Sequence, residues 1–350
     1  MQIGLLQRSL KSADQAAHTL QFEDGSRVLV LVHGGRVLGL FPPSDDENFL
    51  WTQPALASGP STRRFFSSPA WCNSGGDRTW LSPEMDVFLP QYPDLQTYFQ
   101  PRLLDPGHYE LIRGSAPICL RNRLSLRLSR PGCRVRLAIT KSVEASANPL
   151  APEAAIAAPA LKFAGYRLRT TLSLKSQSSP SPVALSLWNL LQLPHGGEML
   201  IPTYGCQEAC VLMGAPSPAD LRSEPGCVRW RMHSSGEHKV SLKSVVCTGR
   251  AGYLLRRTRK DWDLVVRQFQ LQPGQCYPDA PWRTPSDTGH AVQACSVNST
   301  LGAFSELEYH APAVTSAGLH LREDVSDVWA FRGSPASIRK AVTALLGVKV

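Results

Sequence analysis

The chain has 350 residues, of which 43% are hydrophobic, so it is long enough to bury a large core. Its net charge is +9, from 37 Lys and Arg against 28 Asp and Glu, yet no recognisable nucleic-acid-binding module accompanies that charge. The densest basic run, at 256–260, is typical of a solvated loop. We therefore expect no nucleic-acid partner.

The nine cysteines are odd in number and lack the paired spacing of a zinc site, which predicts free thiols. The first twenty residues lack the apolar core and cleavage site of a signal peptide. No run of eighteen apolar residues is present, so no membrane span is expected. Together these features favour the cytoplasm.

Short apolar runs separated by turn signals follow one another from residue 27 onward. A short helix could begin the chain within 1–20, but the strand pattern is the clearer one. Four pairs of runs are typical of hairpins: 28–32 with 37–41, 124–128 with 135–139, 166–174 with 183–191, and 228–232 with 239–246. This rhythm predicts an all-β protein, an antiparallel sandwich or barrel.

The Ala- and Pro-rich stretch at 145–162 is either a loop between two halves of one sandwich or a linker between domains. We favour the loop and a single domain over 1–350, with its core at 25–335, because the strand pattern is similar on both sides. The last element is predicted to be a short helix over 334–347. Ser334 is a good N-cap, Pro335 suits the first helical position, and Gly347 can end the helix.

Polar and aromatic residues gather in the segment 73–84. If it is extended, Arg78 and Trp80 point to one face, where an indole could stack on a sugar ring and a guanidinium could meet its hydroxyls. Asp77 and Glu84 are further candidates for binding a substrate. The alternative is a structural ion pair of Arg78 with Asp77 or Glu84.

A second constellation falls in the run 304–312. As a strand, it places Glu306, Glu308 and His310 on one face, with neighbouring carboxylates roughly 6.5–7 Å apart. Such proximity should raise one carboxyl pKa, which gives an acid–base set together with the histidine. The alternatives are a solvent-facing polar stripe and a metal site.

Two further segments offer candidates. His195 stands at a Gly-rich turn after an apolar strand, and Gln293 closes the run 289–293. Other residues that could line a cleft are Arg267, Tyr277, Asp279 and Trp282. No serine-hydrolase elbow, zinc-protease helix or phosphate-binding loop is present, and we expect neither cofactor nor metal.

In these residues the chain resembles the galactose-mutarotase superfamily, and most of all its bacterial members. The resemblance covers about 25–335 and is carried by the runs 34–37, 75–84, 188–194, 289–293 and 306–312. It implies a β-supersandwich of two large, mainly antiparallel sheets with a sugar-binding cleft. In aldose 1-epimerases a late-strand Glu removes the anomeric proton while a His protonates the ring oxygen. Glu308 matches that Glu, with His195 as the first and His310 as the second candidate acid.

The resemblance therefore implies an aldose 1-epimerase-like protein with a small sugar as its partner. The residues that would bind the sugar are Asp77, Arg78, Trp80, Glu84, Gln293 and Glu306. Two alternatives stay open, a non-catalytic carbohydrate-binding protein and a metal-assisted polysaccharide lyase or glycoside hydrolase, because fold does not determine reaction.

Overall fold

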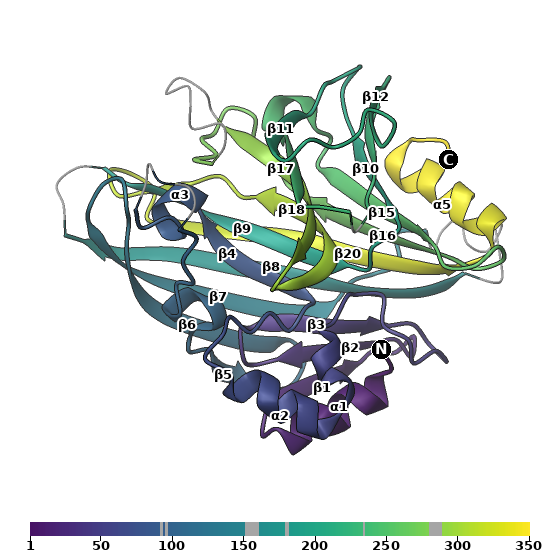
Figure 1. The fold of residues 1–350 in the computed structure, drawn as a ribbon, viewed down its shortest axis with the longest axis horizontal. Coiled ribbons are helices and arrows are strands. Elements are labelled where there is room, and N and C mark those ends of the chain that lie inside the picture. The colour runs from purple at the N-terminus through teal and green to yellow at the C-terminus, as the bar shows by residue number, and fades with distance from the viewer. Residues whose placement is uncertain (92–93, 95–96, 151–160, 179–181, 234, 280–288) are drawn as a thin grey trace.

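Two large antiparallel sheets make up most of the molecule in this computed structural model (Figure 1). The structure describes the chain except residues 92–93, 95–96, 151–160, 179–181, 234 and 280–288. Within those described residues each sheet has ten strands. The predicted all-β class, with two sheets and a C-terminal helix, is confirmed. Most of the Ala- and Pro-rich stretch lies outside the described residues, so its interpretation as a loop stays a prediction.

The first sheet carries the predicted site segments. Its strands, in spatial order, are β1 (Ala17–Gln21), β2 (Arg27–Leu31), β3 (Arg36–Phe41), β4 (Asp77–Ser82), β9 (Ala184–Leu193), β18 (Gly302–His310), β17 (His290–Ser299), β14 (His238–Lys243) and β11 (Cys210–Met213), with β19 (Val314–Thr315) beside β9.

The second sheet is formed by strands that lie between residues 110 and 333. In spatial order its strands are β12 (Leu221–Glu224), β13 (Cys227–Arg231), β10 (Glu198–Pro202), β15 (Arg250–Arg256), β16 (Trp262–Phe269), β20 (Leu321–Gly333), β8 (Lys162–Gln177), β7 (Arg134–Ala145), β6 (Ile118–Arg127) and β5 (Glu110–Arg113).

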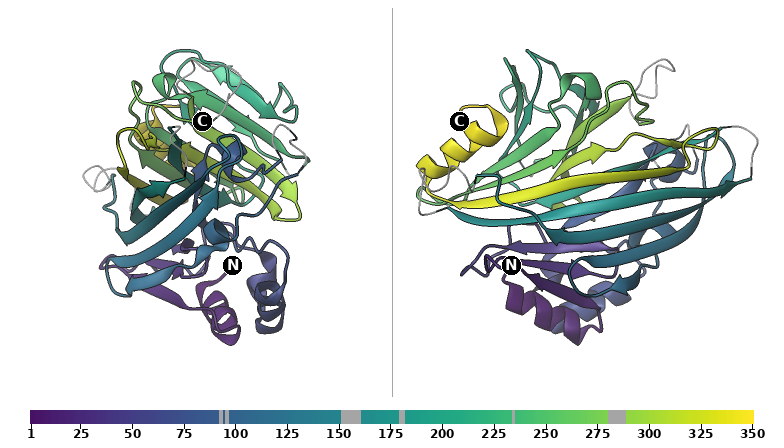
Figure 2. Two further views of the ribbon diagram at one scale, coloured as in Figure 1. Left: turned by 90° about the vertical axis from the view of Figure 1, so that its left-hand side faces the viewer. Right: turned by 180° about the vertical axis from the view of Figure 1, so that it is seen from behind.

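Helices pack against the outer faces of the sheets (Figure 2). They are α1 (Ile3–Ser12), α2 (Gly59–Ser67), α3 (Glu84–Val87) and α5 (Pro335–Leu346), with the single turns η1 (Pro54–Ala57), η2 (Leu103–Gly107) and η3 (Ser244–Val246). Helix α5 begins as predicted, since the Ser334 hydroxyl accepts the Ser337 N–H, and it ends at Gly347 with φ of 70°. None of the described helices is long and apolar enough to cross a membrane.

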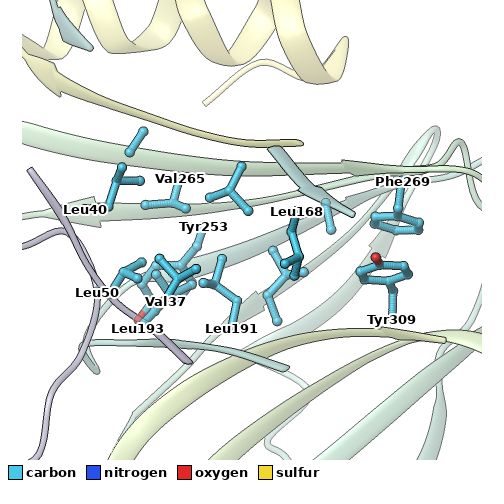
Figure 3. Close-up of a cluster of buried hydrophobic side chains, with 14 of the residues drawn as sticks. Val37, Leu40, Leu50, Leu168, Leu191, Leu193, Tyr253, Val265, Phe269 and Tyr309 are labelled. Carbon is cyan, nitrogen blue, oxygen red and sulfur yellow. The ribbon is translucent and has the colours of Figure 1, made fainter. Parts of the chain in front are cut away.

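The main core lies between the two sheets (Figure 3). Leu191 of β9 and Tyr309 of β18 come from the first sheet, and Leu168 of β8 and Val265 of β16 from the second. Tyr309 stacks on Phe269 with ring centroids 4.4 Å apart. Burying the alternate residues of both sheets in this layer fixes their register, because a slip of one residue would turn polar side chains inward.

Two of the four predicted hairpins are confirmed. β2 pairs with β3, and β6 pairs with β7. The other two predictions are wrong as pairings: β8 lies in the second sheet and β9 in the first, and likewise β13 lies in the second and β14 in the first. Both connections carry the chain from one sheet to the other, and period-2 alternation looks the same whichever sheet a strand joins.

Candidate functional site

The predicted carboxylate stripe of β18 is buried. Glu306, Glu308 and His310 lie on the face of the first sheet turned away from the core, whereas Leu307 and Tyr309 point into the core. Their exposed fractions are 3%, 1% and 0%, so the alternative of a solvent-facing stripe is wrong. Buried charges need partners, and those partners define the site.

The partners of these buried residues come from neighbouring strands and loops. In β4, β9 and β17 the register places Arg78, Gln192 and Gln293 on the same face as the β18 stripe. We name the resulting set the polar cluster, and its members are Arg78, Glu84, Gln192, Lys239, Asp279, Gln293, Glu306, Glu308 and His310.

Arg78 pairs with Glu306. Its Nη2 donates to Glu306 Oε1 at 2.8 Å, and its guanidinium lies 3.6 Å from the ring centroid of Trp80. Gln192 Nε2 donates to the same Glu306 oxygen at 2.9 Å. The sequence correctly placed Arg78 and Trp80 on one face, but the ion pair joins Arg78 to a distant strand rather than to Asp77 or Glu84.

Glu308 lies between an indole and an ammonium. Trp188 Nε1 donates to Glu308 Oε2 at 2.8 Å, and Lys239 Nζ lies 3.6 Å from that oxygen and 3.1 Å from Glu84 Oε2. Burial raises the pKa of Glu308 to about 8; Lys239 opposes this, and the negative charges of Glu306 and Glu84 add to it. At neutral pH the Glu308 carboxyl is therefore mainly protonated.

His310 has its two ring nitrogens in different surroundings. Nδ1 is 3.1 Å from the Ser82 hydroxyl, and Nε2 is 3.7 Å from Asp279 Oδ2. Burial lowers the pKa of His310 to about 4, although Asp279 opposes the shift, so the imidazole is neutral at pH 7. Asp279 is itself held by Gln293 Nε2 at 2.9 Å and by the Glu84 backbone N–H at 2.8 Å.

Aromatic rings border the polar cluster. Trp71, Trp80, Phe88 and Tyr98 pack on one another, with ring centroids 4.5–5.8 Å apart for Trp80–Phe88, Trp71–Trp80, Phe88–Tyr98 and Trp71–Tyr98. Tyr98 is 43% exposed and its hydroxyl donates to Glu84 Oε1 at 2.8 Å, so these two residues form the solvent side of the cluster.

Several polar atoms of the cluster and of the adjacent Trp80 are buried without a hydrogen-bond partner among the described residues. They are Arg78 Nε and Nη1, Trp80 Nε1, Gln192 Oε1, Gln293 Oε1 and His310 Nε2. Buried polar groups in native proteins nearly always have partners, and exceptions often mark functional sites. Both donors and acceptors remain free here, which suits a ligand rich in hydroxyl groups.

Two predicted site residues lie away from the cluster. His195 contacts Ser305 Oγ at 3.0 Å and the Val297 carbonyl at 2.8 Å, so both its ring nitrogens are engaged elsewhere. Asp77 points to the core side of β4, where it accepts from Arg267 and Tyr166. The structure thus brings seven of the nine predicted site residues together and leaves these two apart.

Lys239 and Asp105 belong to the site but were missed by sequence reasoning. Asp105 accepts from Arg36 at 3.1 Å and from Trp71 Nε1 at 2.9 Å, and it lies 3.9 Å from Arg78. Neither residue sits in a distinctive motif. Lys239, for example, alternates with apolar residues like any solvent-facing lysine. Asp279 was among the residues that could line a cleft; Trp282, named with it, lies outside the described residues.

Three buried side chains lie close enough together to be considered as ligands for a cation. The ligand atoms of Cys295, Glu306 and Glu308 lie within 4.8 Å of one another, and His310 does not belong to this group. Arg78 and Lys239 already supply positive charge to the two carboxylates, and burial raises the pKa of the Cys295 thiol. A protonated thiol and carboxylates paired with cations fit a divalent metal poorly.

No protein-family model matches the sequence, and no curated protein matches it. Among solved structures, the chain is similar to a putative mutarotase from Salmonella typhimurium, at 8% identity over 91% of both chains with a TM-score of 0.43. It is similar to a galactose 1-epimerase from Lactobacillus acidophilus NCFM, at 11% identity over 90% of this chain and 94% of that one with a TM-score of 0.43.

A third similar structure is an aldose epimerase homologue from C. elegans, at 9% identity over 91% of this chain and 99% of that one with a TM-score of 0.40. These structures carry the names of the superfamily that the sequence resembles. At such identities and TM-scores they do not indicate which residues act, so a function has to be inferred from the polar cluster itself.

Proposed function

We propose that the polar cluster binds a small sugar and transfers protons at its anomeric centre, as an aldose 1-epimerase does. The observation that carries this proposal is the set of buried atoms without partners around Glu308 and His310. A sugar hydroxyl both donates and accepts, so it can satisfy Arg78 and Trp80 as well as Gln192 and Gln293. The half-exposed ring of Tyr98 offers an apolar surface for the sugar ring.

Glu308 and His310 have the properties of an acid–base pair. They are next-but-one on β18, roughly 7 Å apart along the strand. Since the pKa of Glu308 is raised to about 8 and that of His310 is lowered to about 4, the resting proton belongs to Glu308. Glu308 would then act first as the acid and neutral His310 as the base, the reverse of the roles that the family resemblance implies.

The reaction balances with these two groups alone. His310 takes the proton of the anomeric hydroxyl, Glu308 gives its proton to the ring oxygen, and the bond between C1 and the ring oxygen breaks as the aldehyde forms. After rotation about the C1–C2 bond, the ring oxygen returns its proton to Glu308 and attacks the other face of C1. His310 then returns its proton to the anomeric oxygen. Asp279, 3.7 Å from His310, would stabilise the transient imidazolium.

One observation favours a second candidate, a sugar-binding protein without catalysis. The Lys239 ammonium contacts both Glu84 and Glu308, an arrangement that can hold the carboxylates in place without any proton transfer. Such a protein would use the same polar cluster and the same aromatic surface.

Proton NMR of freshly dissolved α-anomers of common aldoses tests the proposal. The wild-type chain should accelerate anomerisation, and Glu308→Gln should reduce the rate by at least ~100-fold, the typical contribution of general acid–base catalysis. The matched control is Glu323→Gln, which removes an exposed carboxylate of the second sheet. An unchanged rate in Glu308→Gln would rule out the acid–base role, whereas binding without acceleration by the wild type would support the second candidate.

A further inference from the structure

The segment that forms β5, β6 and β7 at one edge of the second sheet carries an unusual share of the chain's positive charge. Between Glu110 and Glu144 the sequence contains seven arginines and one lysine but no aspartate or glutamate. These eight charges nearly equal the net charge of +9 for the whole chain. The rest of the molecule is therefore close to neutral, and the excess is concentrated in one structural unit.

Strand alternation puts most of these arginines on the outer surface. In β6 and β7 the apolar residues Leu124, Leu126 and Val135 face inward, and the intervening arginines face outward. We name this outer surface the basic face; its arginines are Arg121, Arg123, Arg127, Arg134 and Arg136. The outer strands of this sheet form a broad surface (Figure 2, right).

The arginines of the basic face are poorly supplied with acidic partners. Arg127 lies directly opposite Arg134 in the strand register, an arrangement that is destabilising for like charges. Only Arg123 has an ion pair within the described residues, with Glu110 at 3.6 Å, where both side chains are more than 60% exposed. By contrast, Arg167 and Arg169 of neighbouring β8 are paired with Asp327 and Glu323.

A groove of about 550 Å³ continues the basic face at the edge of β6. β5 pairs only with the stretch from Cys119 to Arg121, so no described strand covers this edge near Arg127. The lining includes Phe99, Arg102, Leu103, Ser125, Arg127 and Ser129. Phe99 is 51% exposed. An exposed aromatic ring and the guanidinium groups of Arg102 and Arg127 in one groove offer both stacking and hydrogen bonding to a charged sugar unit.

We propose that the basic face and this groove bind a linear acidic polysaccharide. Its carboxylates would pair with Arg127, Arg134 and Arg136, because planar guanidinium groups match carboxylates in a two-pronged geometry. One sugar ring would lie against Phe99 in the groove. This site lies on the second sheet and does not depend on the function proposed for the polar cluster.

The shape of the basic face favours a polysaccharide over a nucleic acid. It is a sheet surface, without a helix or ribbon that could enter a groove of duplex DNA. The described strands β6 and β7 contain no aromatic residue on which successive bases could stack. Instead, the hydroxyl-bearing residues Thr140 and Ser142 lie among the arginines.

The test is binding of the full chain to polygalacturonate, with dextran as the neutral polymer, at low and at moderate salt. Polygalacturonate should bind and dextran should not, and added salt should weaken binding because the contacts are exposed ion pairs. The double variant Arg127→Ser/Arg134→Ser should weaken binding by about tenfold. Its thermal midpoint should not fall, since two opposed like charges are removed.

A matched double variant distinguishes binding at a defined site from general attraction by the net charge. Arg259→Ser/Lys260→Ser removes the same charge from the exposed loop after β15, and it should change the affinity less than about twofold. Equal weakening in the two double variants would overturn the proposal, because the attraction would then be general. Tighter binding to duplex DNA or to vesicles of anionic lipid than to polygalacturonate would also overturn it, in favour of a different polyanion.

Discussion

Two buried polar networks lie on opposite faces of the same strands, and they differ in how fully they are satisfied. On the core side of β4, both carboxylate oxygens of Asp77 accept hydrogen bonds, from Arg267 and from Tyr166. Arg267 completes its hydrogen bonding with Ser326. On the outer side of the same strand, Arg78 has two nitrogens without a hydrogen-bond partner among the described residues.

The difference suggests different purposes. A network that satisfies every donor and acceptor can hold the sheets together and specify their register. A network that leaves donors and acceptors free in a buried place destabilises the empty protein, and a ligand that fills those positions removes the penalty. We therefore interpret the core network as structural and the polar cluster as a binding site.

The largest effect is expected in the core network. Asp77→Ala leaves the Arg267 guanidinium buried without its carboxylate, which should lower the free energy of unfolding by about 3–5 kcal/mol. Urea unfolding measures this change. Asp46→Ala is the control, because its pair with Arg27 is exposed and should contribute less than about 1 kcal/mol. Equal effects in the two variants would contradict a structural role for Asp77.

The next largest effect is expected in the pH dependence of stability, to which the polar cluster contributes. The pKa of Glu308 is raised from 4.5 to about 8, so the folded chain keeps a proton that the unfolded chain has lost. This stabilisation is complete below pH 4.5 and is lost as the pH rises through 8. The pKa of His310 is lowered from 6.5 to about 4, so its stabilisation is present above pH 6.5 and is lost only as the pH falls through 4.

Between pH 6.5 and 8 only the Glu308 contribution of these two changes. The wild-type chain should therefore lose stability relative to Glu308→Gln by on the order of 1 kcal/mol per pH unit in this window. Urea unfolding at a series of pH values gives both curves. Parallel curves would mean that Glu308 has an ordinary pKa and that the proposed resting proton is misplaced.

The smallest effect on stability is expected when the removed polar group has no hydrogen-bond partner. Trp80→Phe deletes an indole N–H that has no partner, so it should lower the free energy of unfolding less than a comparable change that also breaks a hydrogen bond. Sugar affinity should nevertheless fall several-fold, since that N–H is available to a hydroxyl. Trp188→Phe is the contrasting variant: it removes the hydrogen bond to Glu308 and should cost more stability. A larger loss of stability in Trp80→Phe would contradict the comparison.

The sequence predicted correctly which side chains share a face of one strand. It placed Glu306, Glu308 and His310 on one face of their strand, and Arg78 with Trp80 on one face of theirs, because side chains in a strand alternate with a period of two. The β2–β3 and β6–β7 hairpins followed from the same signal together with short turns.

The sequence was uninformative where contacts join distant segments. Arg78 and Glu306 are 228 residues apart, and Lys239 reaches Glu84 across 155 residues. Nothing local distinguishes Lys239 from a surface lysine. The sequence also does not indicate which sheet a strand joins, as for β8, β9, β13 and β14. A connection within a sheet and one between sheets have similar turn residues.

The most direct test of the account is sugar binding to Glu308→Gln, measured by ligand-observed saturation-transfer NMR with common aldoses. This variant keeps the shape of the polar cluster and should not convert the sugar, so binding is seen without turnover. We expect saturation transfer to at least one aldose. It should be lost when Arg78 is also changed to Met and retained when the distant Arg169 is changed instead. Absence of transfer to every aldose from a folded protein, or transfer that survives the loss of Arg78, would contradict the assignment of the polar cluster as a sugar site.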